Sequence, residues 1–556
     1  MSQLLEITIV NTGERLQVEG GTTLAELLPR LASPLGFAPI CALVNNRTES
    51  LAYPLFMPKM VEFLRPEGRS SRRVLARSLC MLLYKAVSAV YPGARLVIEH
   101  SLSHGYICRL TASEGENEAD LHPDLEKLLE EMRRLVAMDL PFERHEKPTS
   151  EVIPQLRSQG LHSTVCLLET LRQLYTVYYT LDGLADVYHG PLAPSTGALQ
   201  VFDLKPVRGG FLLLPPDSEH PEHAAVPEDQ PKMQAAFDRH LQFNRIVGVS
   251  DVGELNKAID AGHAPMLINL CEALHSKQLA QIADEISKRE ARIVLIAGPS
   301  SSGKTTTGKR IGVELLTNLL KPKMISLDDY FVDRELTPRD ASGDYDYESL
   351  YALDLPKLSA DLTTLLAGGE VNLPTYSFEL GRRVERDRPM RLLPREVLVI
   401  EGIHGLNPAL VPGVDPAKIF KVYVSALTTL SIDDHNWIPT SDNRLLRRIV
   451  RDHKYRKTSA VETIRRWDSV ARGENRWIFP YQENADATFN SSLLFELAVM
   501  KPYAEPLLRS VPHDLPQYAE AARLLRFLEC IRPLREEGIP GTSLLREFLG
   551  GSSFNY

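Results

Sequence analysis

The segment Gly298–Thr305 restricts the fold of this 556-residue chain more than any other feature. It has the spacing G-x-x-x-x-G-K-[ST] and lies between an apolar, β-branched run, Arg292–Ala297, and a helix-favouring stretch, Thr306–Leu320. A buried strand, a glycine-containing turn and a helix in this order are typical of a phosphate-binding loop. The sequence therefore predicts an α/β domain whose parallel sheet carries helices on both faces.

The residue types in this loop suit a bound phosphate chain. Gly298 and Gly303 let the backbone direct its N–H groups at phosphate oxygens, and the N-terminus of the following helix adds partial positive charge. Lys304 should contact the β- and γ-phosphates, and the Thr305 hydroxyl should bind Mg²⁺. We therefore expect ATP and Mg²⁺ as ligands. The other predicted phosphate-binding residues are Ser300, Ser301, Ser302 and Thr306.

Carboxylates follow two later apolar runs. Lys323–Leu327 ends in Asp328, and Glu396–Ile400 ends in Glu401. The carboxyl ends of parallel strands meet at the ligand-binding edge of an open sheet. Asp328 is therefore placed to accept or orient the proton of an acceptor hydroxyl, and Glu401 is suited to bind Mg²⁺ or its water.

Residues from about 290 to 510 resemble the uridine kinase and phosphoribulokinase group of P-loop kinases. The segment Ile325–Phe331 is similar to the segment of that group that bears the catalytic Asp, which falls on Asp328. The resemblance implies ATP-dependent phosphoryl transfer to a small hydroxyl acceptor, most readily the 5′-hydroxyl of uridine or cytidine. It also implies that Lys304 takes part in catalysis.

The same resemblance implies an acceptor site. Its predicted residues are Tyr330, Asp346, Tyr376, Phe378 and Arg383. The pair Tyr345-Asp346 resembles the aromatic-Asp pair that holds ribose hydroxyls, and Leu373–Phe378 resembles the Pro-x-Tyr-Asp-Phe strand of the group. However, the Asp of that strand falls on Ser377, and the base-reading His falls on Gly381. Because buried polar groups give strong discrimination among substrates, these departures leave the acceptor open.

The arginine-rich segment Asn443–Asp452 resembles the lid helix of this group. Arg448, Arg451 and Arg456 match its phosphate-contacting arginines, whereas a fourth falls on Thr458. The resemblance implies that Arg448 and Arg451 act on the transferred phosphoryl group and that Arg456 binds ATP phosphates. A solvated basic helix is the alternative interpretation.

The N-terminal half predicts two further domains. Residues 1–66 combine a hairpin pattern with the capping box Thr23–Glu26, and they resemble the β-grasp TGS domain, which contacts RNA or partner domains in known families. A packing module without a ligand of its own is the alternative.

Residues 67–225 form an α+β unit that resembles the editing-type domain of threonyl-tRNA synthetase. The four chemical positions of that domain fall on Arg77, Met81, Tyr188 and Leu192, so we expect the fold without editing chemistry.

The remaining segments are helical. Residues 226–290 predict a helical connector, 291–510 the kinase-like domain, and 511–556 a C-terminal helical tail. The whole order resembles bacterial proteins that fuse TGS, synthetase-like and uridine-kinase-like domains.

The composition of the chain restricts where we expect the protein to be located and which partners we expect it to bind. The net charge of −9 provides no global basic field, so nucleic acid would need a local patch. The six cysteines are scattered, which argues against a zinc site and a disulfide framework. No apolar run reaches the roughly 18 residues that span a bilayer, and Met1–Glu6 lacks the start of a signal peptide. We expect a cytoplasmic protein without membrane contact. The small-molecule acceptor and RNA, through the N-terminal half, are the expected partners, and self-association is left open.

Two other functions remain as alternatives at this point. One is a phosphoribulokinase-like kinase that acts on a sugar or sugar phosphate. The other is an RNA-linked or tRNA-linked regulatory ATPase, in which the phosphate-binding loop acts as a switch. Asp328, Asp346 and Tyr376 favour a kinase, because a simple ATP switch has no use for acceptor-binding residues.

Overall fold

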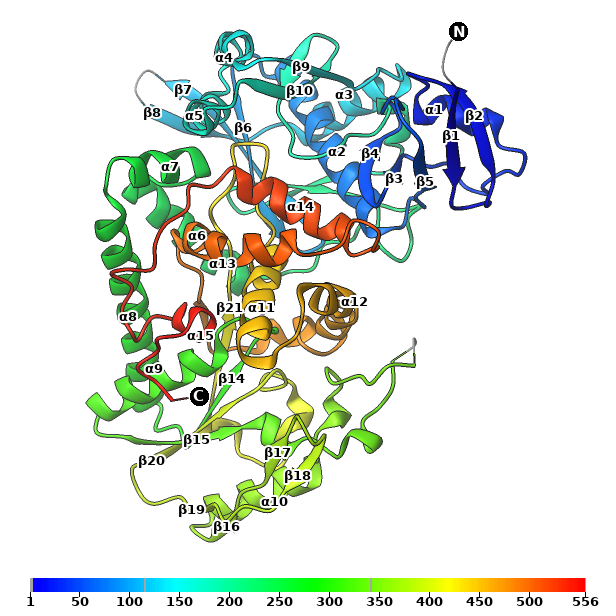
Figure 1. The fold of residues 1–556 in the computed structure, drawn as a ribbon. Helices are drawn as coiled ribbons and strands as arrows, with labels where there is room; N and C mark the ends of the chain where they lie inside the picture. Colours follow the sequence, from blue (N-terminus) through cyan, green and yellow to red (C-terminus); the bar gives the residue numbers. More distant parts are fainter. Residues whose placement is uncertain (1–3, 115–116, 341–342, 556) are drawn as a thin grey trace.

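The computed structural model describes residues 4–114, 117–340 and 343–555 (Figure 1). Met1–Gln3, which belong to the predicted N-terminal domain and to the segment considered for a signal peptide, lie outside the described residues. In Figure 1 the N-terminal domains occupy the upper part of the molecule, and the sheet that carries the phosphate-binding loop lies below them.

The N-terminal domain is a five-stranded sheet with the order β2-β1-β5-β3-β4. The strands are β1 (Leu4–Ile9), β2 (Arg15–Glu19), β3 (Cys41–Val44), β4 (Arg47–Ser50) and β5 (Lys59–Phe63). The predicted capping box is present at Thr23, which precedes α1 (Leu24–Leu27), and α1 buries Leu24 and Leu27. A separate small core beneath this sheet agrees with the predicted α+β unit.

The second domain is built around the long helix α2 (Arg69–Val90). This helix is 22 residues long, and most of its residues are buried. One sheet has the order β12-β13-β7-β6 with β8 beside β7, and a second has the order β11-β10-β9. The strands are β6 (Arg95–Leu102), β7 (Gly105–Glu114), β8 (Asn117–Leu121), β9 (Glu143–Pro148), β10 (Tyr175–Leu181), β11 (Leu184–Asp186), β12 (Asp203–Val207) and β13 (Gly210–Leu214). The other helices are α3 (Leu125–Ala137), α4 (Thr149–Ser158) and α5 (His162–Leu171).

Three helices follow, and the last belongs structurally to the next sheet. They are α6 (Pro231–Val247), α7 (Val252–Asp260) and α8 (Ala264–Lys288). In α8, Leu279, Ile282 and Ile286 share one hydrophobic core with Val294 and Phe420 of the sheet. The boundary predicted at residue 290 therefore passes through a single core.

The predicted parallel sheet has the order β15-β20-β14-β21-β22, and each neighbouring pair is parallel. Its strands are β14 (Ile293–Ala297), β15 (Lys321–Ser326), β20 (Glu396–Glu401), β21 (Ile419–Ser425) and β22 (Ala487–Asn490). The side chains of β14 alternate between two cores. One core contains α8 and α9 (Lys304–Thr317), and the other contains α10 (Leu355–Leu366). The predicted fold class is confirmed, because helices cover both faces of a parallel sheet.

Two small antiparallel sheets at the bottom of Figure 1 carry the predicted acceptor strand. One pairs β16 (Glu370–Asn372) with β19 (Pro389–Arg391), and the other pairs β17 (Thr375–Ser377) with β18 (Arg382–Val384).

The C-terminal part forms a helical layer between the two halves of the molecule (Figure 1). It contains α11 (Thr440–Arg456), α12 (Ala460–Trp477), α13 (Glu496–Arg509), α14 (Tyr518–Glu529) and α15 (Arg546–Leu549). Among the described residues, no helix combines the length and apolar character needed to cross a membrane.

The loop that leads from β21 into α11 is fixed by the second domain. Asp434 pairs with Arg95 at 2.8 Å, the His435 ring lies 2.8 Å from Asp186, and the Asn436 amide donates to the Val187 carbonyl at 2.9 Å. The start of the predicted lid helix is therefore anchored outside the kinase-like sheet.

Candidate active site

The phosphate-binding loop takes a backbone course that depends on glycine. At Gly298, a Cβ atom would lie 1.9 Å from the Val424 carbonyl oxygen, so a side chain cannot be accommodated there. Gly303 has a φ of 87°, and Ser301 has a φ of 58°, in the left-handed region that costs energy for a serine. This close approach brings the loop onto the carboxyl edge of the sheet.

The predicted carboxylates gather at the same edge. Glu401 ends β20, directly opposite Ile296 of β14, and it accepts a hydrogen bond from the Ser326 hydroxyl at 3.0 Å. Asp328 lies just beyond β15 in the 3-10 helix η3 (Leu327–Tyr330), and it is exposed to the cleft. The Lys304 ammonium donates to the Pro299 carbonyl at 3.0 Å, and no carboxylate forms an ion pair with it among the described residues.

Charges interact strongly among these three groups. Desolvation and, to a smaller extent, the neighbouring Asp328 raise the pKa of Glu401 to about 7. Desolvation also raises the pKa of Asp328, while Lys304 opposes that shift. Burial lowers the pKa of Lys304, although both carboxylates favour its charged form. The three side chains therefore form one electrostatic cluster at the end of the loop.

The donor groups at this edge fit a magnesium ion. The Thr305 side chain makes no hydrogen bond with any described residue, and Glu401 uses only one of its oxygens to accept a hydrogen bond. Hydroxyl and carboxylate oxygens are the ligands that Mg²⁺ prefers.

The three predicted phosphate-contacting arginines lie on α11. Arg448 donates to the Ser300 hydroxyl at 2.9 Å and lies 3.3 Å from Asp452. Arg451 and Arg456 also pair with Asp452, at 2.9 Å and 3.6 Å. One carboxylate thus balances three guanidinium groups, and the remaining positive charge stands beside the phosphate-binding loop.

Two more arginines of α11 hold the loop itself. Arg444 donates to the Ser300 carbonyl at 3.1 Å and pairs with Glu474, and Glu474 accepts from the Ser300 N–H at 2.9 Å. Arg447 donates to the Ser301 carbonyl at 3.3 Å and pairs with the buried Glu496.

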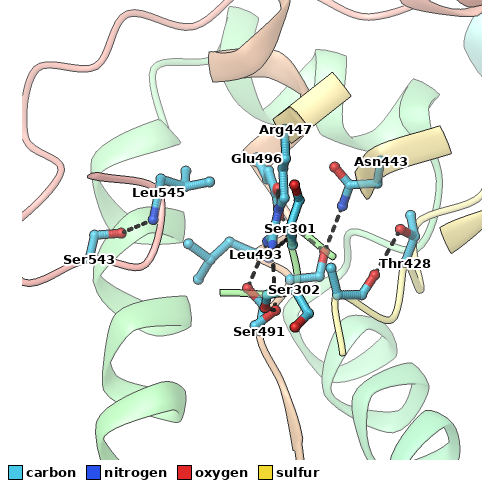
Figure 2. Close-up of polar contacts among 12 residues, drawn as sticks. Ser301, Ser302, Thr428, Asn443, Arg447, Ser491, Leu493, Glu496, Ser543 and Leu545 are labelled. Atoms are coloured by element: carbon cyan, nitrogen blue, oxygen red, sulfur yellow. Dashed lines mark hydrogen bonds and ion pairs between the residues drawn. The ribbon is translucent and has the colours of Figure 1, made fainter. Parts of the chain in front are cut away.

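Figure 2 shows Arg447, Glu496 and Ser491 together at Ser301 and Ser302, and the Ser491 hydroxyl donates to the Ser302 carbonyl at 2.5 Å. The sequence pattern did not reveal the ion pairs of Arg444 and Arg447 that support the phosphate-binding loop. Glu474 and Glu496 lie 30 and 49 residues from their arginine partners, on helices of their own.

The C-terminal tail also reaches the loop. Glu547 accepts hydrogen bonds from the Thr306 N–H at 3.2 Å and from the Thr306 hydroxyl at 2.6 Å, in the first turn of α9. Leu544 packs on Gly303, and the Phe548 ring lies 5.0 Å from the Arg447 guanidinium. A carboxylate of the chain thus lies at a helix N-terminus that favours anions.

On the predicted acceptor side, the rings of Phe331, Tyr376 and Phe378 pack together as an aromatic group. Tyr376 and Phe378 lie 5.2 Å apart, and both rings contact Phe331. The buried Tyr376 hydroxyl has no hydrogen-bond partner in the described structure, and Phe378 is half exposed. Tyr347, which the sequence pattern did not single out, packs edge-on against Phe331.

Three predicted acceptor residues are directed elsewhere. Tyr330 is fully buried and donates to Asp361 at 3.0 Å, so it does not line the cleft. The Arg383 guanidinium is used by Asp354 at 2.9 Å and by the carbonyls of Phe331 and Tyr330.

The third residue, Asp346, accepts from the Glu348 N–H at 3.2 Å, so its carboxylate stabilises a local turn. The acceptor role of these three residues stays a prediction, and each side chain has an internal hydrogen-bond partner that no motif specifies.

A different arginine stands at the position where the base-reading side chain was expected. Gly381 has a φ of 66°, and a Cβ atom there would lie 2.6 Å from the Arg334 guanidinium carbon. Arg334 donates to the Phe378 carbonyl at 2.8 Å. The Arg334 guanidinium therefore occupies the space that a side chain at residue 381 would need.

Comparison with known proteins agrees with this geometry. Residues 293–494 match the description "Phosphoribulokinase / Uridine kinase family". This match lies in the C-terminal half of the chain and includes the phosphate-binding loop and α11. A solved structure described as a "Possible Uridine Kinase" from Bacillus stearothermophilus is 24% identical, with a TM-score of 0.22, and the match covers 26% of this chain and 79% of that chain.

A second solved structure, D-glycerate 3-kinase from Cryptococcus neoformans, is 12% identical with a TM-score of 0.21, and the match covers 48% of this chain and 89% of that chain. Because both TM-scores are low, the assignment rests on the family match and on the site geometry.

The N-terminal half matches a different group of proteins. Threonine–tRNA ligase from Desulforamulus reducens is 25% identical over 209 residues, which is 37% of this chain and 32% of the relative. The ligase from Citrifermentans bemidjiense is 25% identical over 203 residues, which is 36% of this chain and 31% of the relative. The chain thus spans about a third of the length of these curated relatives. The predicted fusion of a synthetase-like part with a kinase-family part is confirmed.

Proposed function

We propose that this protein transfers the γ-phosphoryl group of ATP to a hydroxyl of a small acceptor, most readily the 5′-hydroxyl of a ribonucleoside. The convergence of Asp328, Glu401 and Lys304 at the end of the loop carries the proposal. An ATPase switch needs the lysine and a magnesium-binding carboxylate, but it does not need a second carboxylate beside them to accept the proton of an acceptor.

In the proposed reaction, the loop N–H groups and Lys304 hold the β- and γ-phosphates, and Arg448 and Arg451 stabilise the charge of the transferred group. Asp328 accepts the proton as the acceptor oxygen bonds to the γ-phosphorus. The bond to the β-phosphate oxygen breaks, and ADP and the phosphorylated acceptor are released. A bound magnesium ion would neutralise phosphate charge, with Thr305 and Glu401 as its protein ligands.

On this proposal, the protein's own side chains would also exclude water from the bound phosphates. Arg444 and Arg448 of α11 contact Ser300 of the loop, and the ring of Phe331, which directly follows η3, contacts Tyr376. A closed, dry cleft favours transfer to the bound acceptor over hydrolysis of ATP.

Arg334 favours one second candidate, a sugar-phosphate kinase. A guanidinium at the acceptor end of the cleft can bind a phosphate group that the acceptor already carries. In that case an anionic acceptor would replace the nucleoside, while the chemistry at Asp328 would stay the same.

The discriminating experiment measures ADP release from Mg-ATP with the purified chain and a panel of acceptors. The panel contains the ribonucleosides, ribulose 5-phosphate, pantothenate and transfer RNA, and the phosphorylated product is identified by mass. We expect a ribonucleoside to stimulate turnover. Stimulation by the sugar phosphate alone would favour the second candidate, and stimulation by transfer RNA without a phosphorylated product would contradict both kinases.

We also propose a cytoplasmic location, since the proposed donor is ATP, and contact with RNA through the synthetase-like half. Sedimentation of the purified chain with and without transfer RNA would test the contact, and it would also reveal self-association.

A further inference from the structure

A large cavity lies far from the phosphate-binding loop, between the second domain, the loop before α11, and α14. Its volume is about 520 Å³, and no residue of Gly298–Thr305 lines it. Tyr106, Leu199, Trp437 and Phe527 contribute apolar walls. The volume falls in the range of about 300–1,000 Å³ that is usual for small-molecule sites.

Arginines line one end of this cavity. Four residues line both the large cavity and a small adjoining one of about 30 Å³, namely Arg73, Arg77, Arg523 and His189. Arg47 of β4 and Arg526 of α14 complete the small one. Three parts of the chain that are distant in sequence thus bring cations to one point.

Two of these guanidinium groups have no acidic partner. Arg523 pairs with Asp442 at 2.6 Å and with Glu520 at 2.7 Å, and Glu520 also pairs with Arg73. In contrast, Arg77 donates only to the Pro191 carbonyl, at 2.9 Å and 3.2 Å. Arg526 forms no hydrogen bond through its guanidinium and no ion pair with any described residue.

Unpaired positive charge in this setting is costly. Burial and, to a smaller extent, the nearby Arg526 lower the pKa of Arg77 to about 10. Burial likewise lowers the pKa of Arg526, and Arg47 adds to that effect, whereas Glu49 and Glu529 oppose it. Because removing a charge from water without a counter-charge in contact costs free energy, an anion bound between Arg77 and Arg526 would stabilise the cluster.

His189 supplies a third polar group that lacks a partner. Its Nε2 atom is buried without a hydrogen bond in the described structure, while Nδ1 lies 3.6 Å from the Cys530 sulfur. Burial lowers the pKa of His189 to about 4, so the ring is neutral near pH 7. A neutral imidazole can donate one hydrogen bond to an anion.

We propose that this cavity binds a phosphate monoester of nucleotide size. The phosphate group lies among Arg77, Arg526 and His189, where two guanidinium groups can donate to its oxygens. The apolar or aromatic body of the ligand packs against Tyr106, Leu199 and Trp437. The site is independent of the proposed phosphoryl transfer, because it shares no residue with the phosphate-binding loop.

The test is calorimetric titration of AMP, GMP, CMP and UMP, each into the full chain saturated with magnesium and a non-hydrolysable ATP analogue. We expect at least one nucleotide to bind with one equivalent at this site, and its nucleoside to bind at least tenfold more weakly. Arg77→Gln/Arg526→Gln should weaken that binding at least tenfold. Arg133→Gln, which changes an exposed arginine of α3, should leave it unchanged. Binding at the acceptor cleft would survive the double substitution, so the two sites can be distinguished.

Two further variants distinguish the loss of the binding site from the loss of the folded structure. Val201→Trp narrows the apolar end without touching the arginines, and it should also weaken nucleotide binding. Arg526→Met removes an uncompensated cation, so it should raise the melting temperature of the ligand-free protein while weakening binding. The proposal is overturned if none of the four nucleotides binds, if the nucleoside binds as well as the nucleotide, or if the double variant binds like the wild type.

Discussion

Glu547 is the residue whose position has the most direct consequence for the proposed donor. Its carboxylate accepts two hydrogen bonds from Thr306 at the N-terminus of α9, where a phosphate chain on the loop would also place negative charge. ATP and Glu547 therefore compete for the same donors.

Replacing Glu547 with Gln should strengthen ATP binding. The amide keeps the size of the side chain but removes the negative charge, so we expect the KM for ATP to fall roughly fivefold, or about 1 kcal/mol. Steady-state kinetics with varied ATP would measure this. Glu537→Gln, an exposed change in the same tail, is the control and should have no effect. An unchanged or higher KM for Glu547→Gln would show that the contact does not oppose the nucleotide.

At the residue scale, the positions of the proposed donor-side residues follow from the sequence more directly than the surroundings of the proposed acceptor-side residues. The positions of Lys304, Asp328 and Glu401 could be predicted because each ends or follows a strand of the parallel sheet, and strand ends in a parallel sheet meet at one edge. Tyr330 and Arg383 were not, because their positions in a motif do not reveal the internal partners Asp361 and Asp354. Glu547 lies in a tail whose path no local pattern specifies.

Helix α11 is the element on which the site depends most. Its first half is buried and its arginines hold the phosphate-binding loop through carbonyl oxygens, so this half is part of a fixed scaffold. The sequence predicted a lid helix with three phosphate-facing arginines. It did not predict that Arg444 and Arg447 would be buried in ion pairs.

Breaking the buried pair of Arg447 and Glu496 should be strongly destabilising. Both side chains are fully buried, so Arg447→Met leaves an uncompensated carboxylate and should cost about 3–5 kcal/mol of unfolding free energy. Arg447→Met combined with Glu496→Leu should recover much of that loss. Arg509→Met, which breaks an exposed pair with Glu505, should cost less than about 1 kcal/mol. Urea denaturation would measure all three, and equal effects of the buried and exposed changes would refute the account.

The loop before α11 should make stability depend on pH. Burial and, to a smaller extent, the nearby Asp186 raise the pKa of Asp433 to about 7. Asp433 Oδ1 accepts from the Asn436 N–H and side-chain amide, whereas Oδ2 is buried without a partner in the described structure. The nearby titratable groups are Asp186, Tyr188, His435 and Cys530.

The direction in which stability changes with pH follows from the raised pKa of Asp433. The folded state retains the proton up to about pH 7, so the contribution of Asp433 to stability is fully present at low pH and is lost as the pH rises through about 7. Asp433→Asn keeps the accepting oxygen and does not titrate. It should raise the melting temperature more at about pH 8 than at about pH 5. Asp229→Asn, at an exposed position, is the control, and a gain for Asp433→Asn that does not depend on pH would contradict this explanation.

At the scale of the whole molecule, the domains are more interdependent than their separate sequence patterns indicate. Helix α8 completes the core of the kinase-family sheet, and the second domain anchors the loop that starts α11. Sequence patterns identified each unit because periodicity and motifs are local. They did not reveal the contacts between the domains, because Asp434 and Asn436 contact residues hundreds of positions away in the chain.

A chain that contains only residues 226–556 should therefore be poorly stable. It would expose the buried Ile432, Asp433 and His435 to water and leave the start of α11 without its supports. We expect a lower melting temperature than that of the full chain, together with at least tenfold weaker binding of a non-hydrolysable ATP analogue. Differential scanning calorimetry and calorimetric titration would measure both, and a fragment that matched the full chain in both would show that the second domain is not needed.

The central claim is that Asp328 serves phosphoryl transfer to an acceptor. The most direct measurement compares acceptor-dependent ADP release by the wild type, Asp328→Asn and Asp329→Asn. Asp329 is the matched control, because its carboxylate already pairs with Arg388 at 2.8 Å. We predict that Asp328→Asn lowers kcat by roughly 10²–10⁴-fold without changing the affinity for the ATP analogue, while Asp329→Asn keeps most of the activity. Acceptor-dependent turnover that survives Asp328→Asn unchanged would contradict the account.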